Sequence, residues 1–133
     1  MTKFSEKSNY ANSIRYATKG LRAALKSQKN FRFQLFVSVL VVLAAWFLNF
    51  NQIEMCLIVF AIGFVLAAEL FNSVIEFSLD ALYHNKRNTL VGLAKDMSAG
   101  AVLITTITAV VIGLILFINH LLDLFVTGYF WPM

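Results

Sequence analysis

Charged residues are scarce in this sequence, and their scarcity excludes an ordinary soluble domain. Asp, Glu, Lys and Arg make up 14% of the 133 residues, whereas a soluble domain carries about 25%. Hydrophobic residues reach 59%, and they fall into long runs typical of membrane-crossing segments. The length is enough for one domain, so we predict a single integral-membrane domain over residues 1–133.

Cysteine is also rare, and the common phosphate-binding motifs are missing. The one cysteine, Cys56, lies in an apolar run, which excludes an intrachain disulfide and indicates a packing residue. No Cys/His spacing fits zinc, and neither the G-x-x-x-x-G-K-[ST] loop nor the glycine-rich kinase loop occurs. His84 and His120 stand alone, and we interpret them as a solvated loop residue and an interfacial residue.

Three apolar runs predict an all-α protein with three transmembrane helices. We expect the spans over residues 33–48, 55–80 and 97–118, each close to the ~20 residues that cross the hydrocarbon core of a bilayer. A polar turn at 49–54 separates the first two spans, and a loop over 81–93 precedes the third.

An amphipathic surface helix is predicted before the spans, over residues 9–30. Its basic residues recur every three or four positions and form one stripe: Arg15, Lys19, Arg22, Lys26 and Lys29. A basic amphipathic helix lies in the headgroup layer of an anionic membrane. The stripe either anchors the helix only or also meets an anionic substrate.

The basic residues also predict the orientation of the chain. All Lys and Arg lie in residues 1–32 and 86–95, and none lies in the 49–54 turn or the C-terminal segment. Since basic residues stay on the cytoplasmic side, we expect a cytoplasmic N-terminus, a cytoplasmic 81–96 loop and an extracytoplasmic C-terminus. The expected location is a plasma membrane.

The second span contains polar residues that a membrane should reject. Four of them lie three, four and four residues apart, which places them on one helix face; we call them the polar stripe: Glu69, Asn72, Glu76 and Asp80. An acid deep in the bilayer costs about 2.5–3.5 kcal/mol, and such groups usually mark a functional path. The alternative is that Glu69 is neutral and only joins helices by hydrogen bonds.

The third span begins with an adjacent cation and anion, Lys95 and Asp96. We expect both to join the polar stripe at one site at the cytoplasmic end. Several carboxylates with an amide oxygen suit a hard cation, most plausibly Mg²⁺. A magnesium ion with a lysine is what a bound polyphosphate needs, and a deeper carboxylate can take a proton from a hydroxyl. Since the site is expected to open towards the bilayer, that hydroxyl would belong to a lipid.

These residues resemble the bacterial diacylglycerol kinase and undecaprenol kinase family. The resemblance rests on Glu69-Leu-Phe-Asn-Ser-Val-Ile-Glu76-Phe-Ser-Leu-Asp80 and Ala94-Lys95-Asp96-Met-Ser-Ala-Gly-Ala, with weaker support from Lys19-Gly-Leu-Arg-Ala-Ala24 and Asn30-Phe-Arg32 in the surface helix. It implies a homotrimer with composite sites in the bacterial plasma membrane, which transfers the γ-phosphate of MgATP to the hydroxyl of a membrane lipid alcohol.

The resemblance also implies roles for individual residues. Glu69 would be the general base and Glu76 a metal ligand, while other residues would hold the nucleotide: Asn72, Lys95, Asp96, Asp80, Arg15 and Lys19. One position departs from the family, which usually has a glutamate before the N-F-R stretch acting on the metal. Here it is Gln28, whose amide oxygen can bind a cation without adding charge. Metal binding is therefore expected to be weaker, or activity reduced or lost.

Three functions remain open at this point. The first is an ATP-dependent lipid kinase acting on undecaprenol or diacylglycerol. The second is a kinase-like membrane protein that binds nucleotide or lipid with weakened or lost turnover, as Gln28 would allow. The third is an ion or proton conduit with Glu69 as relay, which leaves Lys95 and Asp96 unexplained. We also expect self-association, because three spans of one chain should be too few to shield the polar stripe from lipid.

Overall fold

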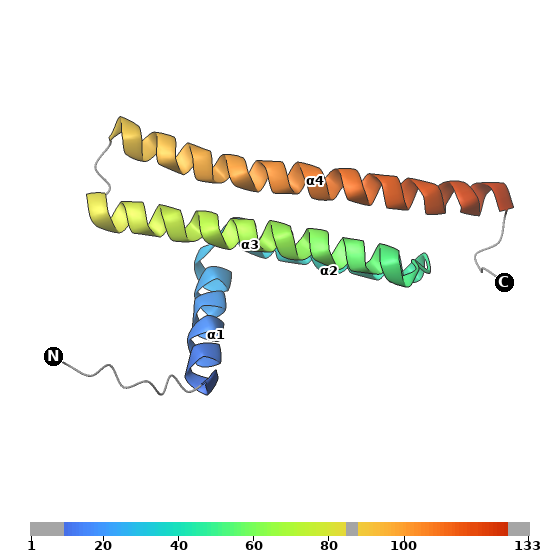
Figure 1. Ribbon diagram of the computed structural model, residues 1–133, viewed down its shortest axis with the longest axis horizontal. Helices are drawn as coiled ribbons and strands as arrows, with labels where there is room; N and C mark the ends of the chain where they lie inside the picture. The colour runs from blue at the N-terminus through green and yellow to red at the C-terminus, as the bar shows by residue number, and fades with distance from the viewer. Residues whose placement is uncertain (1–9, 85–87, 128–133) are drawn as a thin grey trace.

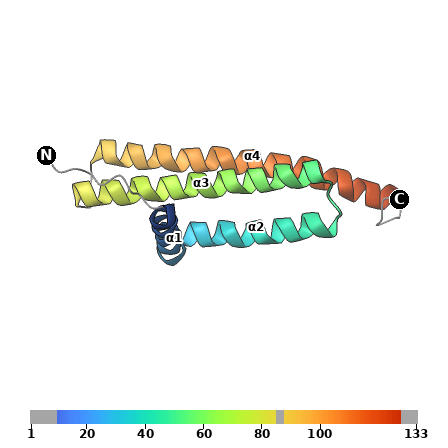
Figure 2. The same ribbon diagram turned by 60° about the horizontal axis from the view of Figure 1, so that its bottom comes forward.

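The described residues form four helices, of which three lie side by side and the first projects away from them (Figure 1). The computed structural model describes residues 10–84 and 88–127. The helices are α1 (Tyr10–Ser27), α2 (Lys29–Phe47), α3 (Gln52–Tyr83) and α4 (Thr89–Thr127). Helix α3 packs against both α2 and α4, whereas α1 packs against α2 and extends sideways from the other three (Figure 2).

Three of these helices are long and apolar enough to cross a membrane, namely α2, α3 and α4. The all-helical architecture with three such helices is as predicted. Helices α3 and α4 are considerably longer than the spans expected at 55–80 and 97–118, because polar residues at their ends continue the helix beyond the apolar run. Much of the predicted 81–93 loop is consequently helical, since α3 ends at Tyr83 and α4 begins at Thr89.

The chain breaks between α1 and α2 at Gln28, which was not predicted. Gln28 has an extended backbone (φ −102°, ψ 109°), so the first helix ends at Ser27 and not at residue 30. Arg32 supports the break, because its Nη1 donates to the carbonyl oxygens of Leu25 (3.1 Å) and Lys26 (3.0 Å). These are among the last carbonyls of α1, which have no partner inside the helix. The Asn30–Arg32 segment therefore belongs to the helix expected to start at 33.

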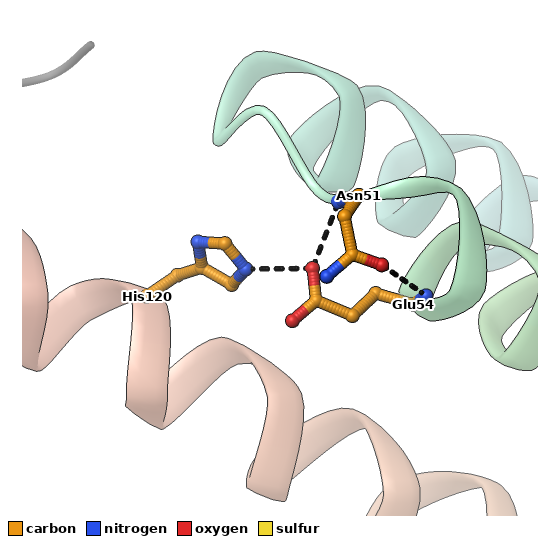
Figure 3. A network of polar contacts seen from close by, with 3 residues as sticks. All are labelled: Asn51, Glu54 and His120. Atoms are coloured by element: carbon orange, nitrogen blue, oxygen red, sulfur yellow. Dashed lines mark hydrogen bonds and ion pairs between the residues drawn. The ribbon is translucent and has the colours of Figure 1, made fainter. Parts of the chain in front are cut away.

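A capping box starts α3 at the opposite end of the bundle. Asn51 Oδ1 accepts a hydrogen bond from the Glu54 backbone N–H (3.0 Å), and Glu54 Oε2 accepts one from the Asn51 backbone N–H (2.8 Å) (Figure 3). The two side chains thereby satisfy backbone donors that the first turn of a helix leaves free. The preceding turn places Asn49 at a positive φ of 55°, a conformation that asparagine adopts more readily than most residues.

His120 on α4 connects to this capping box, so the interpretation of His120 as a residue standing alone is wrong. Its Nε2 lies 3.0 Å from Glu54 Oε2 (Figure 3). Its ring stacks on Phe50 with centroids 4.4 Å apart and planes at 18°, and Phe50 also contacts Phe117 at 4.8 Å. These contacts join the α2–α3 turn to α4, a link between positions 66 residues apart that spacing along the chain could not indicate.

Candidate active site

Glu69 lies buried in the middle of α3, with 3% of its surface exposed. Its Oε2 accepts a hydrogen bond from Gln34 Nε2 of α2 at 3.2 Å. One turn further along α3, the buried Ser73 hydroxyl donates to the Glu69 carbonyl oxygen at 2.9 Å. Glu69 is therefore held by a side chain of a different helix, at the contact between α2 and α3.

Asn72 forms the second link, between α3 and α4. It is 8% exposed, its Oδ1 accepts from the Ser98 hydroxyl at 2.6 Å, and its Nδ2 donates to Glu76 Oε1 at 3.2 Å. Ser98 is itself buried. Glu76 is half-buried, so the Asn72 amide connects a buried hydroxyl on α4 with a carboxylate closer to solvent.

An ion pair completes the stripe near the end of α3. Lys95 of α4 pairs with Asp80 Oδ1, and both side chains are partly exposed, at 33% and 40%. From Glu69 to Asp80, the polar stripe thus changes from a buried carboxyl to a partly exposed ion pair. Its buried part contacts α2 through Glu69 and α4 through Asn72.

Other predicted site residues lie outside this group of contacts. Asp96 is exposed on α4, and Arg15 and Lys19 are exposed on α1. Gln28 is half-buried at the N-cap of α2, where its side chain makes no capping hydrogen bond. Within residues 10–84 and 88–127, no three Asp, Glu, His or Cys side chains gather closely enough to hold a metal by themselves. The expected cluster of several carboxylates is thus not formed by the described part of one chain.

A single chain already shields part of the polar stripe. Glu69 and Asn72 are buried, whereas Glu76 and Asp80 are only half-buried. The side chains of neighbouring helices that bond to the two buried residues are Gln34 of α2 and Ser98 of α4. The opening of the site towards the bilayer and its further shielding by neighbouring chains stay predictions.

Gln34 and Ser98 are the two residues at this site that sequence reasoning missed. Gln34 stood out as a polar residue within an apolar run, which was a usable signal for a partner of Glu69. Ser98 was included in the segment that carries the family resemblance, but its chemistry gave no signal of a partner on α3, because serine is common in membrane helices and can bond to its own backbone. It does make such a bond, to the Lys95 carbonyl oxygen at 2.8 Å, beside its bond to Asn72.

The donor set fits a magnesium ion bound together with nucleotide. Proteins usually hold Mg²⁺ through one or two carboxylates plus substrate phosphates and water, without a complete protein cage. Glu76 offers a half-buried carboxylate of which Oε1 accepts from Asn72, and Asp80 follows one turn later beside a lysine. A cage of three or more protein ligands is absent from the described residues, and a phosphate-bridged ion does not require one.

Comparison with known proteins shows the family to which this chain belongs. Residues 15–117 match the family described as prokaryotic diacylglycerol kinase. A diacylglycerol kinase of Synechocystis sp. is 36% identical over 114 residues, covering 86% of this chain and 65% of that protein. A diacylglycerol kinase of Haemophilus influenzae is 35% identical over 107 residues, covering 80% of this chain and 90% of that protein.

A relative with a different named substrate matches as well. An undecaprenol kinase of Bacillus subtilis is 29% identical over 117 residues, covering 88% of this chain and 94% of that protein. The family match includes the whole polar stripe together with Gln34, Lys95 and Ser98. This chain therefore belongs to the prokaryotic diacylglycerol kinase family and is a lipid kinase.

Proposed function

We propose that the protein transfers the γ-phosphate of MgATP to the hydroxyl of a membrane lipid alcohol, with Glu69 as the general base. The observation that carries the proposal is the position of Glu69. It is a buried carboxylate on an apolar helix, tied to Gln34 and followed on the same face by Asn72, Glu76 and Asp80. The family match supports this reading over an ion conduit.

The proposed reaction moves one proton and one phosphoryl group. Glu69 accepts the proton of the lipid hydroxyl as its oxygen forms a bond to the γ-phosphorus. The bond between that phosphorus and the oxygen bridging to the β-phosphate breaks, and ADP leaves. Glu69 then returns its proton to solvent. This chemistry needs positioning and charge neutralisation more than a covalent enzyme group.

Gln34 supports the assignment of a hydroxyl substrate. Its Oε1 is buried and has no hydrogen-bond partner among the described residues, while its Nε2 is bound to Glu69. A buried acceptor without a partner costs about 1–3 kcal/mol, so a ligand that donates a hydrogen bond there is favoured. A lipid hydroxyl that enters at Gln34 Oε1 would lie beside the Glu69 carboxylate, and it would turn its single proton from Gln34 to Glu69 as the phosphoryl group is transferred.

The nucleotide is proposed to bind at the more exposed end of the stripe. Glu76 would hold Mg²⁺, with Gln28 as a neutral second ligand, and the ion would neutralise phosphate charge when bound. Lys95 is close by, paired with Asp80, and supplies a cation for the phosphates. The remaining proposed contacts to the nucleotide come from Asn72, Asp96, Arg15 and Lys19.

Helix length supports a cytoplasmic location for this nucleotide site. With 32 residues, α3 is about 48 Å long, well beyond the ~30 Å hydrocarbon core. If its first residue lies at the outer surface, Glu69 is about 25 Å along the helix, near the inner boundary. Glu76 and Asp80 then reach the inner headgroup layer, which borders the cytoplasm that supplies ATP. The α1 helix, with its basic stripe, would lie in the same layer.

The test is a kinase assay on purified protein in lipid, with MgATP and a panel containing diacylglycerol, undecaprenol and a lipid without a hydroxyl. We expect phosphorylation of at least one alcohol and none of the last lipid. Glu69→Gln keeps a hydrogen-bonding side chain but no base, so turnover should fall by about 10²–10⁴-fold with nucleotide binding retained. Glu54→Gln, a glutamate of the same helix at the far end, should leave turnover unchanged.

The neutral residue at position 28 supports a second candidate, a kinase-like protein with lost turnover. That candidate predicts binding of MgATP or lipid without phosphorylated product from any alcohol in the panel. If Glu69 only joins helices, Glu69→Gln should preserve turnover, and the base assignment would then be wrong.

A further inference from the structure

Ser98 is the buried residue through which α4 contacts the polar stripe. Its hydroxyl lies 2.6 Å from Asn72 Oδ1, and both residues are less than one-tenth exposed. Thr105, another buried hydroxyl residue on α4, donates within its own helix, to the Val102 carbonyl oxygen (2.9 Å). Ser98 therefore differs from a serine that merely satisfies itself within a membrane helix.

The bond from Ser98 determines which way the Asn72 amide faces. A carboxamide has an acceptor oxygen and a donor nitrogen on opposite sides. With the oxygen bound to Ser98, the nitrogen faces Glu76 and donates to Oε1 at 3.2 Å. The reversed amide would direct its oxygen at the Glu76 carboxylate, placing two acceptors against each other. Ser98 and Glu76 thus favour the same orientation from opposite sides.

The serine hydroxyl has one proton and two nearby acceptors, because the Lys95 carbonyl oxygen lies 2.8 Å away. If the proton turned to that carbonyl, the serine oxygen would face Asn72 Oδ1 without a hydrogen between them. The rotation of the Ser98 hydroxyl and the orientation of the Asn72 amide are therefore coupled. Both are buried, so water cannot easily replace a lost partner.

We propose that Ser98 is a positioning residue for the phosphoryl-transfer site, which fixes the Asn72 amide so that Asn72 orients the Glu76 carboxylate. This inference rests on the proposed function, since it requires Glu76 to bind Mg²⁺ with the nucleotide. With Oε1 held by Asn72, Glu76 would keep its other oxygen available for the ion. Partners that orient a metal ligand typically change metal affinity by 10–100-fold when removed.

The experiment compares Ser98→Ala with wild-type protein by the Mg²⁺ concentration that gives half-maximal kinase rate. We expect that concentration to rise about tenfold, because the amide can now reverse, while the apparent KM for the lipid changes little. Ser98→Cys keeps the size of the side chain but is a weaker donor, and should shift the Mg²⁺ dependence in the same direction. Ser98→Thr retains the hydroxyl and should restore a dependence close to wild type.

Thr105→Val is the matched control, because it removes a buried hydroxyl from the same helix without removing a bond to α3. It should leave the Mg²⁺ dependence unchanged. In an Asn72→Ala background the Ser98→Ala effect should disappear, since residues that act through one another are not additive. Mg²⁺-dependent binding of a non-hydrolysable ATP analogue, measured on the same variants, should follow the same order without requiring turnover.

The outcomes separate this inference from the function on which it rests. If wild-type protein is active or binds the analogue with Mg²⁺, and Ser98→Ala and Ser98→Cys match it, the positioning role is overturned and the proposed function stands. An equal shift in Thr105→Val would also overturn it, because any lost buried hydroxyl would then suffice. If wild-type protein neither phosphorylates a lipid nor binds the analogue, both proposals fail together.

Discussion

Gln28 is the residue whose chemistry most affects the proposed magnesium site. Its backbone is fully used, since its N–H donates to the Ala24 carbonyl (2.8 Å) and its own carbonyl accepts from the Arg32 N–H (3.3 Å). Its side chain makes no capping bond and is half-buried. The amide is consequently not committed to holding the helix junction.

Gln28→Glu should lower the Mg²⁺ concentration needed for half-maximal rate, if residue 28 shares the ion with Glu76. A carboxylate adds a charge that attracts a hard cation more strongly than an amide oxygen does. It should also favour the N-terminus of α2 by about 0.3–1 kcal/mol through the helix dipole, so thermal stability alone would not be informative. The measurement is therefore the Mg²⁺ titration of kinase rate.

A Glu76→Gln background provides the control for this change. Because two ligands of one ion should not act additively, Gln28→Glu should do little once Glu76 is neutral. An unchanged Mg²⁺ dependence with Glu76 intact would mean that residue 28 serves only the α1–α2 junction. The polar stripe with Asp96 would then hold the ion without it.

Sequence reasoning at the residue scale identified the polar stripe but not its partners. Helical periodicity places Glu69, Asn72, Glu76 and Asp80 on one face wherever the helix lies. Which residues of α2 and α4 meet that face depends on the rotation and axial register of each helix. Neither quantity can be read from a single sequence, so Gln34 and Ser98 were not predicted as partners of the stripe. Lys95 and Asp96 were both expected at the stripe, but only Lys95 contacts it.

At the scale of the helices, the apolar runs predicted three spanning segments but not where the helices end. The length of a hydrophobic run is set by the thickness of the hydrocarbon core. A helix can continue beyond that run, because polar residues also adopt the helical conformation. Gln28 breaks the chain without a proline or glycine, so no local signal indicated it. The α3 start was predictable in principle, because Asn51 followed by Glu54 has the spacing of a capping box.

Asn51→Ala should destabilise the protein by about 1 kcal/mol, the usual cost of losing an N-cap side chain. It removes the acceptor for the Glu54 backbone N–H, while the backbone N–H of residue 51 and the His120 contact to Glu54 Oε2 stay in place (Figure 3). The measurement is the midpoint of unfolding in a denaturing detergent titration. Gln52→Ala, at the adjacent exposed position, should not shift that midpoint, and an equal shift in both variants would argue against a specific role for the cap. Kinase activity per folded molecule should be unaffected, since the cap lies at the end of α3 remote from Glu76.

At the scale of the whole molecule, the basic residues of the described part lie on α1, the start of α2 and the start of α4. Helix α1 and the start of α2 lie towards the end of the molecule at which α4 begins, although α3 and α4 extend beyond them there, and the α2–α3 turn lies towards the opposite end (Figure 1). Lys3, Lys7, Lys86 and Arg87 fall outside the described residues. This distribution is what the predicted orientation requires, and the orientation itself stays a prediction.

The direction of α1 bears on how many chains make one site. Helix α1 packs against α2 and extends away from α3 and α4 (Figures 1 and 2). Arg15 and Lys19 are exposed on it. Within one chain, the packing of α1 against α2 does not bring these two side chains into contact with the polar stripe. If these cations bind the nucleotide held at Glu76, a neighbouring copy is the simplest source of that Glu76. The expected trimer would then be needed for the chemistry, although not for shielding Glu69.

Mixing two defective variants distinguishes a shared site from a site within one chain. Arg15→Gln removes the proposed nucleotide contact on α1, and Glu69→Gln removes the proposed base on α3. Each variant alone should lose most kinase activity. In a shared site, some subunit borders join α1 of a Glu69→Gln chain, which keeps Arg15, to α3 of an Arg15→Gln chain, which keeps Glu69. Both residues are intact at such a border. Random mixing in equal amounts should restore about a quarter of wild-type activity, since one in four pairings at a cyclic interface is fully intact. With both residues supplied by one chain, no pairing is intact and the mixture should stay inactive.

Reconstituting the two variants in separate vesicles is the control, because no exchange of subunits can occur there. A wild-type particle that is active as a strict monomer would contradict the shared site directly.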